Sequence, residues 1–156
     1  MQTTDQKLMH LSMSLAQVSR AYRSVADKVI GDYGLSQATA WPLLMIGRLG
    51  EGVRPGAVAD SLGLEPSSLV RVLDQLVEAG LVERSEDASD RRAKILHLTA
   101  SGRKCANKLE TALTAFRREL FKGAAPADIE AATRVLDGLG LALAGYEGTA
   151  AGRKAS

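Results

Sequence analysis

The stretch from Leu64 to Thr99 constrains the fold most, because one short segment joins a helical pattern to a hairpin pattern. Pro66 suits the first turn of a helix, where the amide hydrogen that proline lacks would have no partner, and Gly80 ends that helix. Short runs at 81–84 and 94–98 then predict two strands, which are joined by a charged hairpin tip. The segment therefore predicts a helix followed by a two-stranded hairpin.

Five other helices are predicted from apolar residues at steps of three and four, together with capping residues and glycine stops. A short helix at 56–62, ended by Gly63, precedes the helix near Pro66, and this pair has the form of a helix-turn-helix. The remaining elements are a long helix from the Thr3 and Gln6 capping box to Gly31, a helix at 37–49 capped by Ser36, a very short strand at Val53, a helix from Thr99 to about Lys122, and one from Pro126 to Tyr146.

These elements predict a fold that is mainly α with a small β-hairpin wing, a winged helix-turn-helix with further helices at both ends of the chain. The winged helix-turn-helix is expected at residues 35–98, a helical dimerisation region at 1–34 and 99–147, and a flexible tail at 148–156. The terminal helices carry apolar seams that the small central unit cannot cover, which favours a homodimer in which they interlock. A monomeric bundle, in which the same helices fold back, is the alternative.

Charge and hydropathy limit the classes of protein to which this chain can belong. The net charge of +2 is only slightly basic, and residues 50–98 contain six Lys or Arg against nine Asp or Glu. Nucleic-acid binding must therefore depend on where the charges lie, and we expect it to be strongly salt-dependent. No run reaches the roughly 18 apolar residues of a membrane span, and Met1 to Lys7 is too polar for a signal peptide. A cytoplasmic protein without membrane contact is expected.

Catalytic and metal chemistry have little support in the sequence. His10 and His97 belong to separate predicted elements and no set of Ser, His and acid is suggested, so the chain is not expected to be an enzyme. Two histidines and the one cysteine, Cys105, do not make a dedicated metal site, and no cofactor is predicted. Cys105 lies between Lys104 and Lys108 but close to an apolar stripe, which favours a partly buried core thiol over a redox-sensing one.

The helix that starts near Pro66 has two different faces. Its inward face carries the apolar residues Leu69, Leu73, Leu76 and Val77. Ser68, Arg71 and Gln75 share another face, from which Arg can bind a guanine edge, Gln can pair with adenine and Ser can reach phosphates or bases. Asp74 and Glu78 are expected to orient basic neighbours or to face solvent. The alternative is an ordinary amphipathic surface helix.

The hairpin tip supports the DNA-binding interpretation. Arg91 and Arg92 follow a helix-turn-helix closely enough to cross the phosphate backbone and enter the minor groove, where narrow A·T-rich DNA attracts guanidinium groups. Asp90 beside them would weaken anion binding by its charge, yet a carboxylate can also orient an arginine. An ordinary solvated turn is the alternative.

Two strings in this region resemble the winged helix-turn-helix of MarR-type bacterial transcription regulators, and among them the SlyA branch. They are EPSSLVRVLDQLVEAGLVER on the helix and following strand, and ASDRRAKILHLT across the wing. Asp90 and Arg92 match the Asp-x-Arg feature of the family's wing. The resemblance implies a two-fold dimer on a pseudo-palindromic operator of double-stranded DNA, with two recognition helices in successive major grooves.

The resemblance also assigns DNA contacts residue by residue. It places Ser67, Ser68, Arg71 and Gln75 in the major groove, and Arg92, oriented by Asp90, in the minor groove. Many family members have Pro where Ser67 stands and Ser or Thr where Val70 stands, so this chain departs from the pattern at both positions.

A ligand site is expected beside the apolar seam of the first helix. Small residues recur there around Arg23, whose guanidinium suits a small carboxylate, while Trp41 and Met45 can flank an aromatic ring. An ion pair with Asp27, the (i, i+4) neighbour, or with an acid of the partner chain is the alternative for Arg23.

In the SlyA-type pattern Arg23 stands where an arginine binds the carboxylate of salicylate-like ligands. Ala38 and Val72 stand where that pattern has polar pocket residues, which implies a different ligand or weaker binding. His10 and Ser14 are candidates to complete the pocket from the other subunit, although an exposed helix residue is the alternative for His10.

The sequence thus favours a homodimeric, ligand-responsive, sequence-specific DNA-binding regulator, a repressor that a small aromatic or phenolic carboxylate releases. The alternative is a nucleoid-associated or counter-silencing protein that binds many A·T-rich sites without an obligatory ligand.

Overall fold

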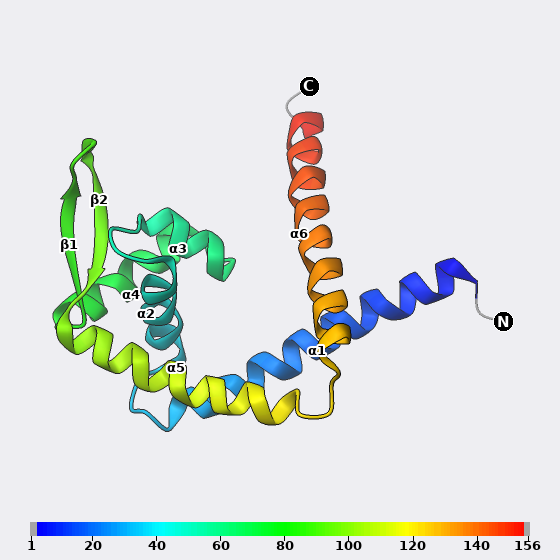
Figure 1. Cartoon of the computed structure of the whole chain (residues 1–156). Coiled ribbons are helices and arrows are strands. Elements are labelled where there is room, and N and C mark those ends of the chain that lie inside the picture. Colours follow the sequence, from blue (N-terminus) through cyan, green and yellow to red (C-terminus); the bar gives the residue numbers. More distant parts are fainter. Residues whose placement is uncertain (1–2, 155–156) are drawn as a thin grey trace. The chain divides into compact units, whose positions relative to one another are not determined.

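The computed structural model describes residues 3–154, and the side chains of residues 3–146. Within these residues the elements follow in the order α1 (Thr4–Gly31), α2 (Gln37–Leu49), α3 (Pro55–Leu62), α4 (Pro66–Glu78), β1 (Val82–Asp87), β2 (Asp90–Leu98), α5 (Ala100–Leu120) and α6 (Pro126–Lys154) (Figure 1). This helical architecture with one antiparallel hairpin in the described part of the chain confirms the predicted fold class.

Capping side chains set the helix starts that the sequence predicts. Thr3 Oγ1 accepts the backbone N–H of Gln6 at 3.2 Å, and the Gln6 side chain accepts the N–H of Thr3 at 2.9 Å, so the capping box of α1 is present. At the start of α2, Ser36 Oγ accepts the N–H of Thr39 at 3.3 Å. Local side chains therefore determine where these two helices begin.

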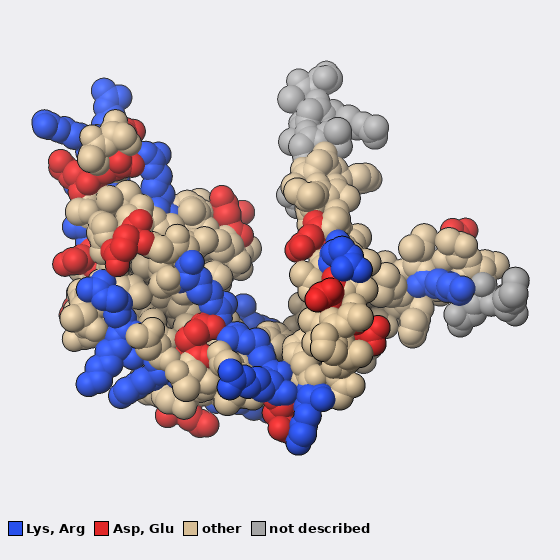
Figure 2. Space-filling view, in the orientation of Figure 1, with Lys and Arg blue, Asp and Glu red and all other residues tan. Residues whose placement is uncertain are grey.

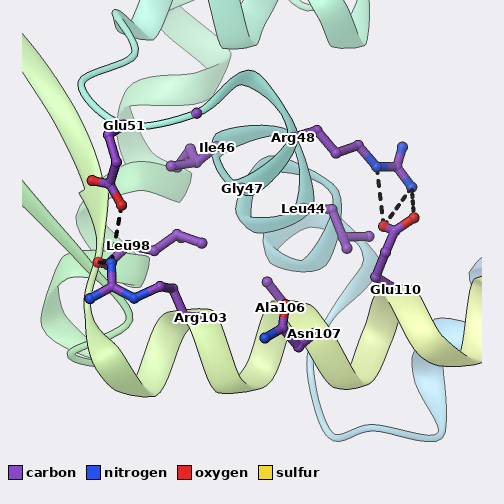
Figure 3. Close-up of a pocket in the computed structure, with 11 residues that line it drawn as sticks. Leu44, Ile46, Gly47, Arg48, Glu51, Leu98, Arg103, Ala106, Asn107 and Glu110 are labelled. Carbon is purple, nitrogen blue, oxygen red and sulfur yellow. Dashed lines mark hydrogen bonds and ion pairs between the residues drawn. The ribbon is translucent and has the colours of Figure 1, made fainter.

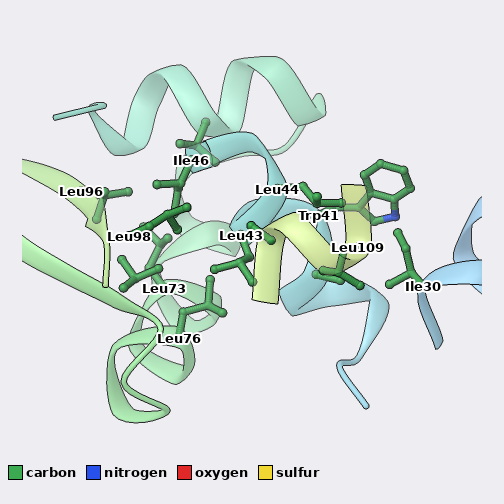
Figure 4. Close-up of a cluster of buried hydrophobic side chains, with 14 of the residues drawn as sticks. Ile30, Trp41, Leu43, Leu44, Ile46, Leu73, Leu76, Leu96, Leu98 and Leu109 are labelled. Atoms are coloured by element: carbon green, nitrogen blue, oxygen red, sulfur yellow. The ribbon is translucent and has the colours of Figure 1, made fainter. Parts of the chain in front are cut away.

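The hydrophobic core lies where α1, α2, α4, β2 and α5 meet. Side chains from these elements point toward one another in Figure 4. Its largest fully buried members include Ile30, Leu43, Ile46, Leu76, Leu96 and Leu109. Because α2 contributes buried residues along most of its length, it is the central helix of the domain.

The hairpin is longer than the sequence predicts. The strands expected at 81–84 and 94–98 extend to Asp87 and back to Asp90, so most of the expected loop is strand and the turn is confined to Ala88 and Ser89. Both faces of this outer part are exposed, and polar residues on both faces leave no alternation from which the sequence can reveal strands. At its base, the expected short strand is a single antiparallel bridge, Val53 to Leu96.

The start of α5 is fastened to the turn that follows α4. Thr99 Oγ1 accepts the N–H of Gly102 at 3.0 Å, which confirms the predicted cap, and donates to the carbonyl of Gly80 at 2.7 Å. Gly102 lies so close to the backbone carbonyl of Leu81 that a Cβ at this position would overlap it. The first turn of α5 therefore requires glycine for a close backbone approach.

α1 and α6 each expose many large apolar side chains. On α1 these are Leu8, Met9, Leu11, Met13, Leu15, Val18 and Val25. On α6, taken by itself, they are Ile129, Val135, Leu136, Leu139, Leu141, Leu143 and Tyr146. The chain divides into two compact units between Arg117 and Arg118, with α6 in the second unit.

The C-terminal helix continues beyond the apolar pattern that reveals it. The sequence predicts a loose tail from Gly148, whereas α6 remains helical to Lys154, and residues 155–156 lie outside the described part of the chain. The segment combines two glycines, which disfavour a helix, with Ala150 and Ala151, which favour one, so local propensity does not specify where the helix ends. Within the described residues, no helix is long and apolar enough to cross a membrane.

Candidate DNA-binding surface and ligand groove

The outer face of α4 presents the four side chains that the sequence assigns to the major groove. Leu69, Leu73 and Leu76 are buried on the inner face, and this turns Ser67, Ser68, Arg71 and Gln75 outward, where all four are exposed. Within residues 3–146, the side chains of Arg71 and Gln75 make no hydrogen bond or ion pair. They are free to bind a partner molecule.

Asp74, which lies between Arg71 and Gln75 in the sequence, already forms an ion pair. Asp74 Oδ1 lies 2.7 Å from Nη2 of Arg84 on β1. This confirms that Asp74 orients a basic neighbour, as the sequence predicts. The ion pair also links α4 to the first strand of the hairpin.

The end of the hairpin carries the arginines that the sequence assigns to the minor groove. Arg91 and Arg92 are exposed on β2, and their guanidinium groups have no partner within the described side chains. Figure 2 shows Lys and Arg at the end of the hairpin farthest from the helices, with Asp and Glu below them. Asp90 Oδ1 accepts the backbone N–H of Arg92 at 3.0 Å, so Asp90 orders the backbone here and does not hold the guanidinium.

A second ion pair at the hairpin is not evident from the sequence. Arg54 Nη2, at the start of α3, lies 2.6 Å from Asp87 Oδ2 at the end of β1. The hydrogen bond from Arg54, with further hydrogen bonds from Ser89, lowers the pKa of Asp87 to about 2. The two residues are 33 positions apart, and only the extended register of the hairpin brings them together.

The base of the hairpin contains a chain of hydrogen bonds that the sequence also does not suggest. His97 lies 3.0 Å from Ser85 Oγ through Nε2 and 2.9 Å from Glu51 Oε2 through Nδ1. Arg103 of α5 donates to Glu51 Oε1 at 3.2 Å. The bond to His97, with a smaller contribution from Arg103, lowers the pKa of Glu51. A Ser, His and acid set therefore does exist, and it joins the hairpin to the turn between α2 and α3.

A cavity of about 370 Å³ separates the C-terminal half of α2 from α5 (Figure 3). An ion pair closes each end: Arg48 with Glu110 at 2.8 Å, and Arg103 with Glu51. Burial would raise the pKa of Glu110, but hydrogen bonds from Arg117 and Arg48 outweigh it and lower that pKa. These pairs connect the central helix of the winged domain to the helix that leads out of it.

A second cavity, of about 360 Å³, brings together four of the seven predicted ligand residues. Arg23 from α1, Ala38 and Trp41 from α2, and Val72 from α4 all line it. The other lining residues are Gln37, Pro42, Leu62, Leu64 and Ser68. This wall is mostly apolar, as a site for an aromatic ring requires, and it includes two residues of α4.

Arg23 forms the ion pair with Asp27 that the sequence offers as the alternative to a ligand role. Its Nε lies 3.3 Å from Asp27 Oδ1, and its guanidinium carbon lies 4.3 Å from the centre of the Trp41 ring. Trp41 Nε1 donates to the same Asp27 oxygen at 2.7 Å. The ion pair is therefore present at the edge of the cavity, and it fixes the orientation of the indole.

The structure does not bring the other three predicted ligand residues to this cavity. Met45 packs against the core from α2. His10 and Ser14 lie on α1, away from the residues that line the cavity, and a site completed by a partner subunit stays a prediction. An adjoining hollow along α1 shares Arg23 and Gln37 with the cavity and is also lined by Ser19, Arg20, Ser24, Asp27 and Lys28.

Comparison with known proteins gives consistent matches. The model of the MarR family matches residues 33–93. The transcriptional regulator PA3341 is 32% identical, with 85% of this chain and 97% of that chain covered and a TM-score of 0.79. CouR from Rhodococcus jostii RHA1, solved with p-coumaroyl-CoA bound, is 28% identical, with 83% and 90% covered and a TM-score of 0.74.

The regulator SlyA is 16% identical, with 85% of this chain and 93% of that chain covered and a TM-score of 0.72, which shows likeness of fold. The family model covers the helix-turn-helix, the first strand of the wing and its tip, and a regulator of 32% identity matches along almost its whole length. The chain therefore belongs to the MarR family of transcription regulators.

Proposed function

We propose that the protein is a homodimeric, sequence-specific repressor that leaves its operator when a small aromatic or phenolic carboxylate binds. As a MarR-family member it is a transcription regulator with a DNA-binding winged helix, and not an enzyme. The cavity between α1, α2 and α4 carries the proposal, because Ser68 and Val72 in its wall belong to the helix that we expect to read DNA. Acting on chromosomal DNA, such a repressor would work in the cytoplasm.

The position of the cavity supplies a route from ligand to DNA. A ligand that contacts Val72 on one side and Trp41 on the other changes how α4 packs on α2. Ser68 lines the cavity and also stands beside Arg71 on the recognition helix. Binding weakens the DNA complex to the extent that the ligand prefers an arrangement of α4 that does not fit the operator.

Two forms of aromatic ligand suit this cavity. A free carboxylate would take the place of Asp27 at Arg23, with its ring against Trp41. The relative CouR binds p-coumaroyl-CoA, an aromatic acyl group on a phosphorylated carrier. In this chain the adjoining hollow contains Arg20 and Lys28, which form no ion pair within the described side chains and would suit such phosphates.

Dimerisation is supported by the exposed apolar faces of α1 and α6. Within residues 3–146, each helix exposes seven large apolar side chains, and apolar surface that clusters in this way is typical of interfaces. Two copies joined through these helices would present two recognition helices to successive major grooves.

Calorimetric titration with salicylate, p-coumarate and p-coumaroyl-CoA tests the effector. We expect Arg23→Ala to weaken binding of an active ligand about tenfold, the loss of one charged hydrogen bond. Arg20→Ala should weaken only the thioester, and Lys104→Ala on α5 is the matched control that should change nothing. Equal heats for the wild type and Arg23→Ala would remove Arg23 from the site.

Release of the protein from DNA by the ligand is measured separately, by fluorescence anisotropy of an operator duplex selected from a random library. The active ligand should lower operator affinity of the wild type but not of Arg23→Ala. A ligand that binds and leaves the DNA complex intact would contradict the release mechanism without affecting the DNA-binding proposal.

A further inference from the structure

The carboxylate of Asp87, at the end of β1, connects the start of α3 to the hairpin turn. Its Oδ2 accepts from Nη2 of Arg54 at 2.6 Å and from Nε at 3.2 Å. Its Oδ1 accepts the backbone N–H of Ser89 at 2.9 Å and the Ser89 hydroxyl at 2.8 Å. One oxygen therefore faces the start of α3 and the other orders the hairpin turn. We call Arg54, Asp87 and Ser89 the wing clamp.

The wing clamp is the outermost polar connection between the hairpin and the helices in the described residues. The others join the hairpin at Arg84, Leu96, His97 and Leu98, and the pairing of Arg84 with Leu96 and of Val82 with Leu98 places these near its base. Asp87 lies at the far end, opposite Asp90. A two-stranded hairpin is only marginally stable by itself, so its outer part needs such a connection to keep one direction.

We infer that Arg54 and Asp87 are positioning residues, which hold the wing at the inclination that brings Arg91 and Arg92 to DNA. This inference rests on the proposed contact of the wing with the minor groove. Asp87 orders the turn that immediately precedes Asp90, and Asp90 in turn holds the backbone of Arg92 at 3.0 Å. The chain of contacts thus runs from α3 through the turn to the arginines.

For Asp87, charge alone and a positioning role predict opposite effects on DNA affinity. DNA is a polyanion, so removal of the negative charge of Asp87 should strengthen binding if charge were its only role. As a positioning residue, Asp87 should instead be needed for binding. Arg54 gives no such contrast, because a phosphate-binding arginine and a positioning arginine both weaken binding when removed. The sign of the Asp87 effect therefore decides between the two roles.

Glu86 offers a matched control one residue away. Its carboxylate pairs with Lys94 on the opposite strand at 3.4 Å, so this pair lies within the wing and does not reach α3. Glu86→Ala removes the same charge from almost the same place and leaves the clamp intact. We expect this variant to bind DNA as tightly as the wild type, or more tightly.

Anisotropy titration of a selected operator duplex at moderate salt tests the inference. Asp87→Ala and Arg54→Ala should each weaken binding roughly five- to tenfold, and the double variant should be no weaker than the weaker single variant. Hydroxyl-radical footprints should lose protection of the minor groove in both variants and keep it in Glu86→Ala. Asp87→Ala that binds at least as tightly as the wild type, with its footprint intact, would overturn the inference.

Two further measurements distinguish failure of this inference from failure of the proposed DNA contact of the wing. Ser89→Ala removes the hydroxyl contact but leaves the ion pair and the bond from the backbone N–H, so near-wild-type binding by this variant excludes loss of the hydroxyl contact as the cause. Hydrogen exchange on the free protein should be faster at residues 88–92 in Asp87→Ala, and unchanged exchange would also overturn the inference. If Arg92→Ala binds normally while exchange does respond, the proposed DNA contact of the wing is wrong and the clamp only stabilises the hairpin.

Discussion

At the proposed ligand cavity, single residues already contact one another, so a bound ligand would have to compete with these contacts. Arg23 pairs with Asp27 and lies over Trp41, and Trp41 donates to the same carboxylate. A carboxylate bound at Arg23, as we propose, would replace one anion by another and would gain little unless its ring also filled the cavity. We therefore expect the proposed site to select aromatic acids over small inorganic anions.

The arginines proposed to touch DNA are the clearest test at this scale. Arg71→Ala and Arg92→Ala should each reduce operator binding by about 1–3 kcal/mol and leave the dimer intact. Lys104→Ala, which removes an exposed cation from α5, is the control and should leave binding unchanged. Electrophoretic mobility shifts at several salt concentrations measure the effect, and normal binding by both arginine variants would remove them from the interface.

The pKa shifts predict how stability depends on pH. Glu51, Asp87 and Glu110 all have lowered pKa values in the fold, so their contributions are present above the unfolded pKa values and are lost as pH falls through the folded ones. We expect the free energy of unfolding to fall as pH decreases from about 5 to about 2. Urea unfolding across this range measures the effect.

Glu110→Gln isolates one of these groups. At pH 7 it should lower the free energy of unfolding by on the order of 0.5–1 kcal/mol, a value limited by solvent screening of a partly exposed pair. The difference from the wild type should shrink as pH falls, because protonation removes the same charge. A difference that is constant with pH would mean that the ion pairs to Arg48 and Arg117 do not contribute.

At the scale of elements, the helices could be predicted from the sequence and the outer hairpin could not. Thr3, Ser36 and Thr99 act on residues three positions away, so their caps are visible as local patterns. The outer strands have both faces in solvent and therefore no apolar period. Arg54 and Asp87 meet only through the register of those strands, which no local pattern specifies.

The contact of α5 with Leu81 is a further constraint between elements. Gly102→Ala would force a methyl group against the Leu81 carbonyl, and we expect a loss of about 1–3 kcal/mol or more in the free energy of unfolding. Gly56→Ala on α3, where nothing lies within 4 Å, is the matched control and should be neutral or slightly stabilising. Thermal unfolding of the two variants compares them, and equal melting temperatures would contradict the close approach.

For the whole molecule, the sequence predicted the fold more completely than it predicted which residues line the proposed ligand cavity. Arg23, Ala38, Trp41 and Val72 meet because α1, α2 and α4 pack on one core, and the resemblance to a family supplied that packing. Met45 lies four positions after Trp41 and is therefore expected on the same face of α2, yet it packs against the core. Periodicity identifies a face of a helix, whereas the element that covers the face depends on tertiary structure.

Dimerisation is the property on which the proposed function depends at this scale. Leu11 lies on the exposed apolar seam of α1, and Leu11→Glu would place a charge where the proposed interface excludes water. We expect this variant to be largely monomeric in sedimentation equilibrium and to lose operator binding, because one recognition helix covers only half of a two-fold site. Gln17→Glu introduces the same side chain on the same helix but off the seam, and it should remain dimeric. A dimeric Leu11→Glu protein would exclude this part of α1 from the interface, and a monomeric wild type would favour the folded-back bundle.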